Sequence, residues 1–312
     1  MRSGSDVTEV ETPVISVIIA SYNTRELLSR CLASIDGAPA ERACEVLVVD
    51  DASSDGSPEM VRGRFPDVRL IVNRENRGYA YSNNLAIAKS RGRFVYLLNS
   101  DTEVFAGALD HMAGFLETHP DAGAAGSALY NRDGSVQASV KSLPTVRSAL
   151  FGKRSWLARW FPRFSATRSE LLNWRVESGI PFQAGYVSSA SIMIPRDVVE
   201  RVGDLDTRLW YFIDADYCKR IWDIGRAVYC VPAAKVLHVE HLGGTLAGWK
   251  QRFRSMWRFH YGAYIFFRRH SGWAGWHPVT ALIILGIAMR FVLSLGLQTI
   301  KELTGVEREV YG

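Results

Sequence analysis

Short, uninterrupted apolar runs alternate with segments of helical periodicity along the first third of the chain. The runs are rich in β-branched residues and lack alternating polar positions, which is typical of strands buried on both faces of a sheet. Strands are predicted over 14–20, 45–49, 68–72 and 94–98, and helices over 24–35, 58–65 and 80–89. This alternation predicts an α/β fold whose central sheet is mainly parallel and has helices on both faces.

The second half of the chain has a more mixed pattern. A strand with small residues is predicted over 184–194, a helix over 214–224, and a short strand over 227–231 that continues through Pro232 to His238. From about residue 247 onward the sequence is aromatic, basic and helical in character. We therefore expect a flexible leader (1–12), a catalytic domain (13–245) and a C-terminal helical region (246–312).

Polar side chains gather where three of the predicted strands end. The three clusters are Ser21-Tyr22-Asn23, Asp50-Asp51 and Asn99-Ser100-Asp101. In open α/β sheets a ligand binds beyond the carboxyl ends of the strands. This coincidence predicts a binding site at that edge of the sheet.

The strand-end carboxylates favour a metal-assisted way of binding phosphate. No GxxxxGK[ST] motif occurs, and no GxGxxG follows the first predicted strand. Asp101 is the natural metal ligand, with Asn99 as a neutral oxygen donor. Asp50 and Asp51 are adjacent acids after a buried strand, suited to accept hydrogen bonds from a pyrimidine N3–H or from ribose hydroxyls. The alternative in both places is a turn or a helix cap.

Charge is distributed unevenly along the 312 residues, whose net charge is +5. No acidic residue occurs from 241 to 300, whereas this stretch contains seven lysines and arginines interleaved with aromatic residues. Such a mixture favours an anionic membrane surface. Nucleic acid is the competing partner for a basic patch, but a long apolar segment follows directly, so we expect no nucleic acid.

The apolar segment 278–300 is long enough to span a bilayer. Arg290 lies near its middle, where a charge is costly, and it aligns on one helical face with Ser294, Gln298 and Lys301. This pattern favours a helix lying in the membrane interface. The alternatives are a spanning helix and a helix buried against the catalytic domain.

The cysteines and the amino terminus bear on the compartment. Cys31, Cys44, Cys218 and Cys230 form neither a CxxC pair nor a disulfide framework, so reduced and mostly buried thiols are expected. The first dozen residues lack a basic-then-apolar signal pattern. Together with the basic C-terminal region, these features predict peripheral association with the cytoplasmic face of a membrane.

Several motifs, in order, resemble the family 2 glycosyltransferases. They are the first strand with Ser21-Tyr22-Asn23, VVDDASSDGS (48–57), ENRGYAYSNNLAIAKSRGRFVYLLNSDTEV (75–104) and WYFIDADYCKRIWDIGRAVYCVPAAKVLH (210–238). The chain is most similar to the bacterial rhamnosyltransferase-like branch, over roughly 13–245. The resemblance implies a GT-A fold, a nucleoside-diphosphate sugar donor, a divalent cation (Mg²⁺ or Mn²⁺) and inversion at the anomeric carbon.

The resemblance also implies roles for residues that bind the donor. Ala20 and Tyr22 would flank the base, and Asp50 or Asp51 would bind base and ribose, with Asp51 preferred for the base. The DxD metal motif of the family falls on Asn99-Ser100-Asp101, so Asp101 carries most of the metal assignment because the first acid is Asn here. Asn76, Arg77 and Gly78 would border the donor.

The reaction itself would rest on Asp214. The family's glutamate–aspartate pair matches Ile213-Asp214, so the first acid is absent but the aspartate usually assigned as general base is present. Asp216 would support it or cap the following helix. A family histidine that contacts metal or diphosphate matches His238, by its spacing from Pro232, or else His241.

These observations predict an enzyme that transfers a sugar, rhamnose from dTDP-rhamnose being the expected case and UDP the alternative carrier, to a lipid-linked or growing glycan. Asn99 and Ile213 depart from the family pattern. They leave open a second hypothesis, a catalytically silent module that scaffolds polysaccharide assembly. A nicotinamide-dependent dehydrogenase is disfavoured because the glycine fingerprint is absent.

Overall fold

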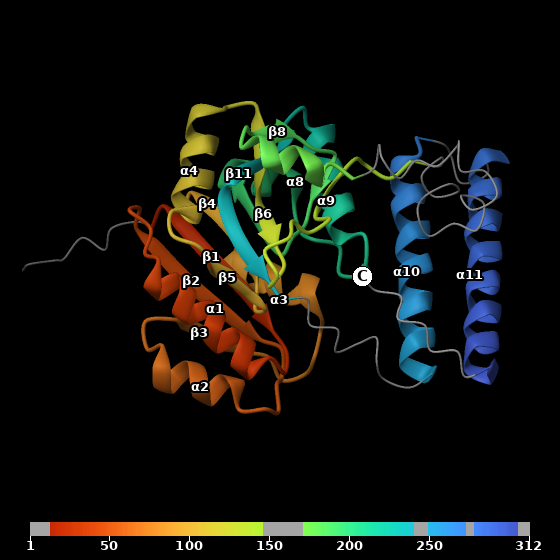
Figure 1. The fold of residues 1–312 in the computed structure, drawn as a ribbon, viewed down its shortest axis with the longest axis horizontal. Coiled ribbons are helices and arrows are strands. Elements are labelled where there is room, and N and C mark those ends of the chain that lie inside the picture. The colour runs from red at the N-terminus through yellow and green to blue at the C-terminus, as the bar shows by residue number, and fades with distance from the viewer. Residues whose placement is uncertain (1–12, 146–170, 240–248, 273–277, 305–312) are drawn as a thin grey trace, which may run out of the picture.

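The computed structural model describes residues 13–145, 171–239, 249–272 and 278–304. The predicted leader (1–12) and His241 lie outside the described residues. Within these ranges, nine strands form one mixed sheet, and α-helices cover both of its faces (Figure 1).

The first half of the sheet is parallel. It consists of β1 (Ile15–Ser21), β2 (Cys44–Asp50), β3 (Arg69–Val72) and β4 (Phe94–Asn99), in the spatial order β3-β2-β1-β4. The intervening helices α1 (Arg25–Gly37), α2 (Ser57–Arg64) and α3 (Tyr79–Lys89) complete the alternation predicted from the sequence.

The second half of the sheet is mixed. Antiparallel β10 (Ser191–Pro195) lies between β4 and β6 (Ala122–Tyr130), and β11 (Ala227–His238) runs parallel to β6. Short β5 (Thr102–Val104) and β8 (Phe182–Gln183) pair antiparallel with β11, and β7 (Val140–Lys141) pairs with β9 (Tyr186–Val187) outside this sheet. The strand predicted over 184–194 is thus two strands, and Pro232 lies inside β11 where its register with β6 shifts.

Two apolar cores lie on the two faces of the sheet. In β1, Ile15, Val17 and Ile19 contribute to one core, and Ile18 contributes to the other, because successive strand residues point to opposite sides. Helices α1, α2 and α4 (Ala108–Thr118) cover the first face. Helices α3, α8 (Arg196–Val202) and α9 (Ile213–Asp223) cover the second, together with the 3₁₀ helix η2 (Asn173–Ser178).

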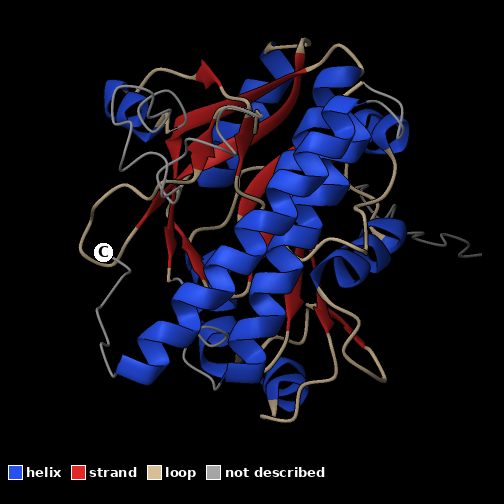
Figure 2. Ribbon diagram, turned by 90° about the vertical axis from the view of Figure 1, so that its right-hand side faces the viewer, coloured by secondary structure: helices blue, strands red, loops and turns tan. Residues whose placement is uncertain are grey.

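The C-terminal region forms two long helices beside the catalytic domain. Helix α10 (Trp249–His270) lies between the α9 side of the domain and α11 (Pro278–Thr304) (Figure 1), and in Figure 2 the two long helices lie in front of the sheet. Phe266 and Phe267 of α10 pack against Ala215 of α9. No helix in the described part of the chain has the length and apolar character needed to cross a membrane.

The outward face of α11 is apolar rather than polar. Arg290, which belongs to the polar face recognised in the sequence, is half-buried, and its guanidinium lies 5.9 Å from the ring of Phe259 on α10. Four apolar side chains of α11, those of Leu282, Leu285, Met289 and Val292, are each more than half exposed. Arg290 therefore lies on the side of α11 that packs against α10.

Candidate active site

The register of the parallel strands brings the three polar clusters together. Ser21 pairs with Asp50 and Ala20 pairs with Asn99, so β1, β2 and β4 end at one level. The Thr24 hydroxyl lies 2.9 Å from both the Ser21 and the Ser100 hydroxyls. The predicted gathering of polar side chains at this edge of the sheet is present in the structure.

The two adjacent acids have different surroundings. Asp51 accepts hydrogen bonds from Asn73 Nδ2 (2.7 Å) and from the backbone N–H groups of Arg77 and Gly78 (3.0 and 2.7 Å), so its carboxylate anchors the loop that leads into α3. Asp50 Oδ1 accepts a hydrogen bond from the Ser53 N–H (2.8 Å). Asp50 Oδ2 is buried and has no hydrogen-bond partner among the described residues. The free oxygen therefore favours Asp50 for contact with a nucleotide, whereas the family resemblance favoured Asp51 for the base.

The remaining predicted donor residues lie around this edge. Ala20 is half-buried at the end of β1, and the Tyr22 side chain that follows is 49% exposed. Asn76 is exposed in the loop that Asp51 anchors, and Gly78 ends that loop with a positive φ of 87°.

Asp101 and His238 come together although 137 positions separate them in the sequence. His238 is the last residue of β11 and pairs with Thr102 of β5, so its Nε2 lies 3.3 Å from Asp101 Oδ1. The backbone N–H of Val239 donates to the Asp101 carbonyl (2.8 Å), which fixes the two segments side by side.

Gln137 determines which imidazole nitrogen faces Asp101. Its Nε2 donates to the His238 carbonyl (2.8 Å) and to Asn131 Oδ1 (2.7 Å), so its Oε1 must accept a hydrogen bond from His238 Nδ1 at 2.9 Å. A neutral His238 then directs the lone pair of Nε2 at a carboxylate oxygen. A cation between the two atoms would remove this repulsion, and a second hydrogen bond of this kind is what orients most metal-binding histidines.

These residues fit a divalent cation that is completed by other ligands. No group of three or more His, Cys, Asp or Glu side chains with metal-binding geometry occurs in the described ranges. Mg²⁺ commonly uses one or two protein ligands together with water and substrate phosphates. Asp101 and His238 suit that mode, and Asn99 lies half-buried at the same strand end.

Asp214 lies in the first turn of α9 and hydrogen-bonds Ser189, whose neighbour Ala190 accepts a hydrogen bond from the Asn99 N–H (3.0 Å). Phe212 before the helix has a positive φ of 67°, which turns the chain into α9. Burial raises the pKa of Asp214 against the opposing effect of hydrogen bonds from Ser189. Its surroundings are mostly apolar and include Leu97, Ile192 and Tyr217. A carboxylate with a raised pKa is suited to accept a proton near neutral pH.

Asp216 connects α9 to the C-terminal region. Burial alone would raise its pKa, but a hydrogen bond from His270 and the charges of Arg220 and Arg269 lower it to about 2. Arg269 and His270 belong to α10 and lie 2.9 Å from Asp216 Oδ1. The Asp216 side chain therefore joins α9 to α10. From the sequence we had expected it either to support Asp214 or to cap the helix.

Sequence reasoning missed one residue of the site, Gln137, which lies in a loop 101 positions from its partner His238. Ser189, which hydrogen-bonds Asp214, likewise lies in a loop. Ser189 also accepts a hydrogen bond at its carbonyl from the Tyr79 hydroxyl (3.0 Å). No local pattern in the sequence marks such contacts.

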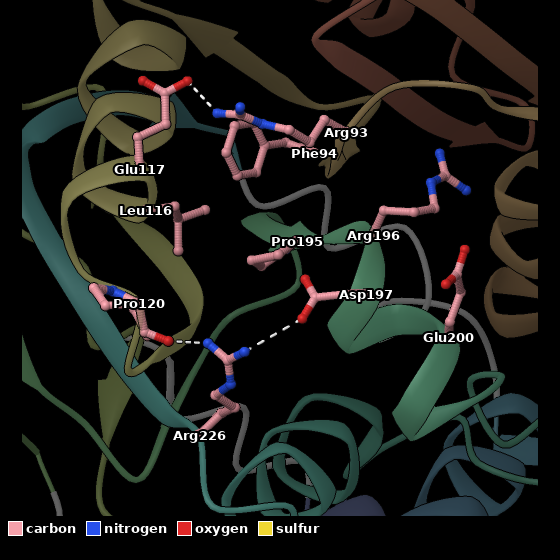
Figure 3. Close-up of a pocket in the computed structure, with 11 residues that line it drawn as sticks. Arg93, Phe94, Leu116, Glu117, Pro120, Pro195, Arg196, Asp197, Glu200 and Arg226 are labelled. Carbon is pink, nitrogen blue, oxygen red and sulfur yellow. Dashed lines mark hydrogen bonds and ion pairs between the residues drawn. The ribbon is translucent and has the colours of Figure 1, made fainter.

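A surface depression lies at the opposite end of the sheet (Figure 3). Its wall includes Phe94, the first residue of β4, and Pro195, which pairs with it. Its arginines are engaged, because Arg93 pairs with Glu117 and Arg226 pairs with Asp197. This end of the sheet is remote from Asp101 and Asp214, so we do not assign the chemistry to it.

Solved structures identify the class of fold. Residues over 96% of the chain superpose on 82% of a mannosyltransferase from Pyrobaculum calidifontis in complex with GDP-Man and Mn²⁺, with a TM-score of 0.54 and 19% identity. GalNAc-T7 with UDP, GalNAc and Mn²⁺ matches over 74% of this chain and 44% of its own, with a TM-score of 0.55 and 17% identity. The fold is therefore that of GT-A-like glycosyltransferases.

The sequence comparisons then define the family. The model of glycosyl transferase family 2 matches residues 16–192, and the chain belongs to this family. It is 30% identical over 278 residues to an N-acetylglucosaminyl-diphospho-decaprenol L-rhamnosyltransferase of Mycobacterium tuberculosis, covering 84% of this chain and 87% of that protein. The chain is thus a glycosyltransferase of the rhamnosyltransferase-like branch, as its motifs predicted.

Proposed function

We propose that this enzyme transfers a sugar, with inversion, from a nucleoside-diphosphate donor to a lipid-linked acceptor that bears a diphosphate. The donor of choice is dTDP-rhamnose, because the similar mycobacterial enzyme is named for rhamnosyl transfer to a diphospho-decaprenol-linked sugar. The observation that carries the proposal is a carboxylate of raised pKa, Asp214, together with the Asp101–His238 pair at the strand edge.

The proposed reaction is a single displacement. The hydroxyl oxygen of the acceptor attacks the anomeric carbon, and Asp214 accepts the proton of that hydroxyl. The bond from that carbon to the diphosphate oxygen breaks on the opposite face, and the nucleoside diphosphate leaves with the bonding electrons. Inversion follows because the new bond forms opposite the one that breaks.

The donor would lie along the carboxyl ends of β1, β2 and β4. We assign the base or ribose contact to the free oxygen of Asp50, and the aromatic face beside the base to Tyr22. Asp101 and His238 would hold the divalent cation, which when bound neutralises charge on the leaving diphosphate. Asp51 would keep the 76–78 loop against the donor through the Arg77 and Gly78 N–H groups.

We further propose that the enzyme works at the cytoplasmic face of a membrane. The exposed apolar stripe of α11 (Leu282, Leu285, Met289 and Val292) would lie among the lipids at the interface. The basic residues of α10 suit an anionic surface. A lipid-linked acceptor would explain why a transferase carries such a surface.

The purified enzyme with Mg²⁺ or Mn²⁺ and a panel of nucleotide sugars tests the proposal. We expect transfer from dTDP-rhamnose to a soluble diphosphate-linked acceptor, and a product of inverted anomeric configuration by NMR. Asp214→Asn should bind donor with unchanged affinity in calorimetry and lose transfer by at least about 100-fold. Undiminished turnover of this variant would eliminate Asp214 as the base.

A further inference from the structure

A pair of arginines on α10 has no carboxylate partner among the described residues. Arg254 and Arg258 are one helical turn apart, and neither forms an ion pair or donates a side-chain hydrogen bond to any residue in the described ranges. Burial, and then the charge of Arg254, lower the pKa of Arg258. Two neighbouring cations with unused donors constitute a potential anion site.

Arg258 is held in place by an aromatic ring. Its guanidinium carbon lies 3.3 Å from the ring centroid of Trp210, a stacking distance. Stacking engages the flat face of a guanidinium and leaves the in-plane N–H groups available, which match the oxygens of a phosphate in pairs. The ring of Trp210 thus positions Arg258 while the N–H groups of the guanidinium remain available for a ligand.

Trp210 connects Arg258 to the 76–78 loop and to the segment that carries Asp214, the proposed general base. A Cβ at Gly78, in the loop that Asp51 anchors, would lie 3.4 Å from the Trp210 ring. Trp210 precedes α9 and lies four positions before Asp214. An anion bound by Arg258 would therefore be close to the loop that borders the sugar donor and to the segment that carries Asp214.

The position of α10 against this segment is tightly constrained. A Cβ at Gly262 would fall 2.8 Å from the Tyr211 carbonyl oxygen, so only glycine allows this approach. Arg258 is one turn and Arg254 two turns before Gly262, on the same face of the helix. With about 5.4 Å per turn, Arg254 lies one turn further from Gly262 along α10 than Arg258.

We propose that Arg258, stacked on Trp210, and Arg254 bind the diphosphate of the acceptor. This inference rests on the proposed function, since it supplies the diphosphate-linked acceptor. The acceptor sugar would extend from Arg258 toward Asp214, and the lipid would extend past Arg254 toward α11. The cation site of Asp101 and His238 serves the donor diphosphate and remains separate.

The test compares two acceptors that differ only in charge. One is a water-soluble N-acetylglucosaminyl diphosphate with a short alkyl chain, and the other is the alkyl glycoside of the same sugar without the diphosphate. Arg258→Gln should raise KM for the first acceptor at least about tenfold with little change in kcat or donor KM, and leave the second unaffected. Arg254→Gln should act in the same direction. Arg268→Gln, an exposed cation on the same helix, is the charge-matched control.

Binding separates this proposal from the proposed function. Geranyl diphosphate, titrated calorimetrically into enzyme with dTDP and Mg²⁺, should bind to the wild type, bind at least about tenfold more weakly to Arg258→Gln, and behave normally with Arg268→Gln. If the wild type transfers to neither acceptor but shows this binding pattern, the reaction is wrong and the site stands. If it transfers and Arg258→Gln behaves like Arg268→Gln, the site is wrong.

Two further outcomes also bear on the inference. Trp210→Leu should raise the KM for the diphosphate acceptor in part, because Arg258 loses its stacking partner. Normal soluble kinetics of Arg258→Gln together with weaker binding to phosphatidylglycerol vesicles would overturn the proposal and assign the two arginines to lipid headgroups.

Discussion

At the scale of single residues, the site separates its carboxylates by environment. Asp214 has mostly apolar neighbours and a raised pKa, whereas Asp51 is saturated with N–H donors and serves structure. Asp50, its neighbour in sequence, retains one buried oxygen without a partner among the described residues. Three aspartates thus differ in their chemistry because burial and neighbouring hydrogen-bond donors differ around each carboxylate.

The raised pKa of Asp214 predicts how activity depends on pH. A general base must be deprotonated, so kcat/KM should fall as pH decreases through the pKa of Asp214. Since burial raises this pKa, the acid limb should lie above the usual aspartate range of about 4. Initial rates from pH 4 to 9 at saturating metal measure it. An acid limb at or below pH 4 would contradict the assignment.

The orientation of His238 predicts an effect of Gln137 on metal affinity. Gln137→Leu removes the acceptor for His238 Nδ1, so the ring can rotate away from Asp101. The Mn²⁺ concentration for half-maximal activity should rise about 10- to 100-fold, and Mn²⁺ titrations followed by electron paramagnetic resonance should show the same loss. Arg132→Gln, at an exposed position of the same turn, should leave both unchanged.

At the scale of elements, the C-terminal helices are fastened to the catalytic domain through a buried ionic cluster. Asp216 of α9 is 1% exposed and contacts Arg220 of the same helix and Arg269 and His270 of α10. Asp206 adds a second contact to Arg269, at 3.2 Å. Helix α10 carries both Gly262 and Arg258, so this cluster also sets the wall of the acceptor side.

Removing the charge of Asp216 should destabilise the protein strongly. Asp216→Asn leaves the surrounding cations uncompensated, and breaking a buried pair in this way costs about 3–5 kcal/mol. Urea denaturation should show this loss. The exposed pair between Lys219 and Asp223 on the same helix is the control, since Lys219→Gln should cost no more than about 0.5 kcal/mol.

The same carboxylate predicts a dependence of stability on pH. The folded pKa of Asp216 is about 2, below its unfolded value. Its contribution is therefore fully present above about pH 4 and is lost as pH falls toward 2. In Asp216→Asn this acid-dependent loss should be smaller than in the wild type. Equal slopes of stability against pH in the two proteins would contradict the prediction.

At the scale of the whole molecule, an exposed apolar stripe lies on the outermost helix. Helix α11 lies beyond α10 as seen from the rest of the fold (Figure 1), and four of its apolar side chains are more than half exposed. The acceptor site inferred on α10 lies between this stripe and the catalytic edge. A lipid-linked substrate would then reach Asp214 from the membrane side.

Membrane binding can be tested on this stripe alone. Leu285→Glu removes about 1.5–3 kcal/mol of apolar burial in the interface and adds repulsion from anionic lipid of about 1 kcal/mol. Binding to phosphatidylglycerol vesicles in co-sedimentation should weaken at least about tenfold, with unchanged activity on the soluble acceptor. Ala33→Glu, at an exposed position of α1, should bind vesicles normally. Equal binding by both variants would exclude this face.

The local sequence determined the parallel half of the fold and the location of the site. Apolar runs and helical periodicity are local properties, so β1 to β4 and their helices occur where predicted, and the polar clusters at their ends follow from parallel pairing. The helix over 214–224 was found for the same reason. The elements α4, β5, β6 and α8 were missed, and β6 (Ala122–Tyr130) is rich in alanine and glycine, which favour strands only weakly.

Only the tertiary structure decided how the site residues divide their work. The free oxygen of Asp50, the orientation of His238 by Gln137, and the link from Asp216 to α10 all depend on contacts between segments far apart in sequence. The direction of the α11 faces likewise depended on packing, since periodicity defines two faces but not which one meets α10. Burial and hydrogen bonding are properties of the packed chain, and these assign each side chain its role.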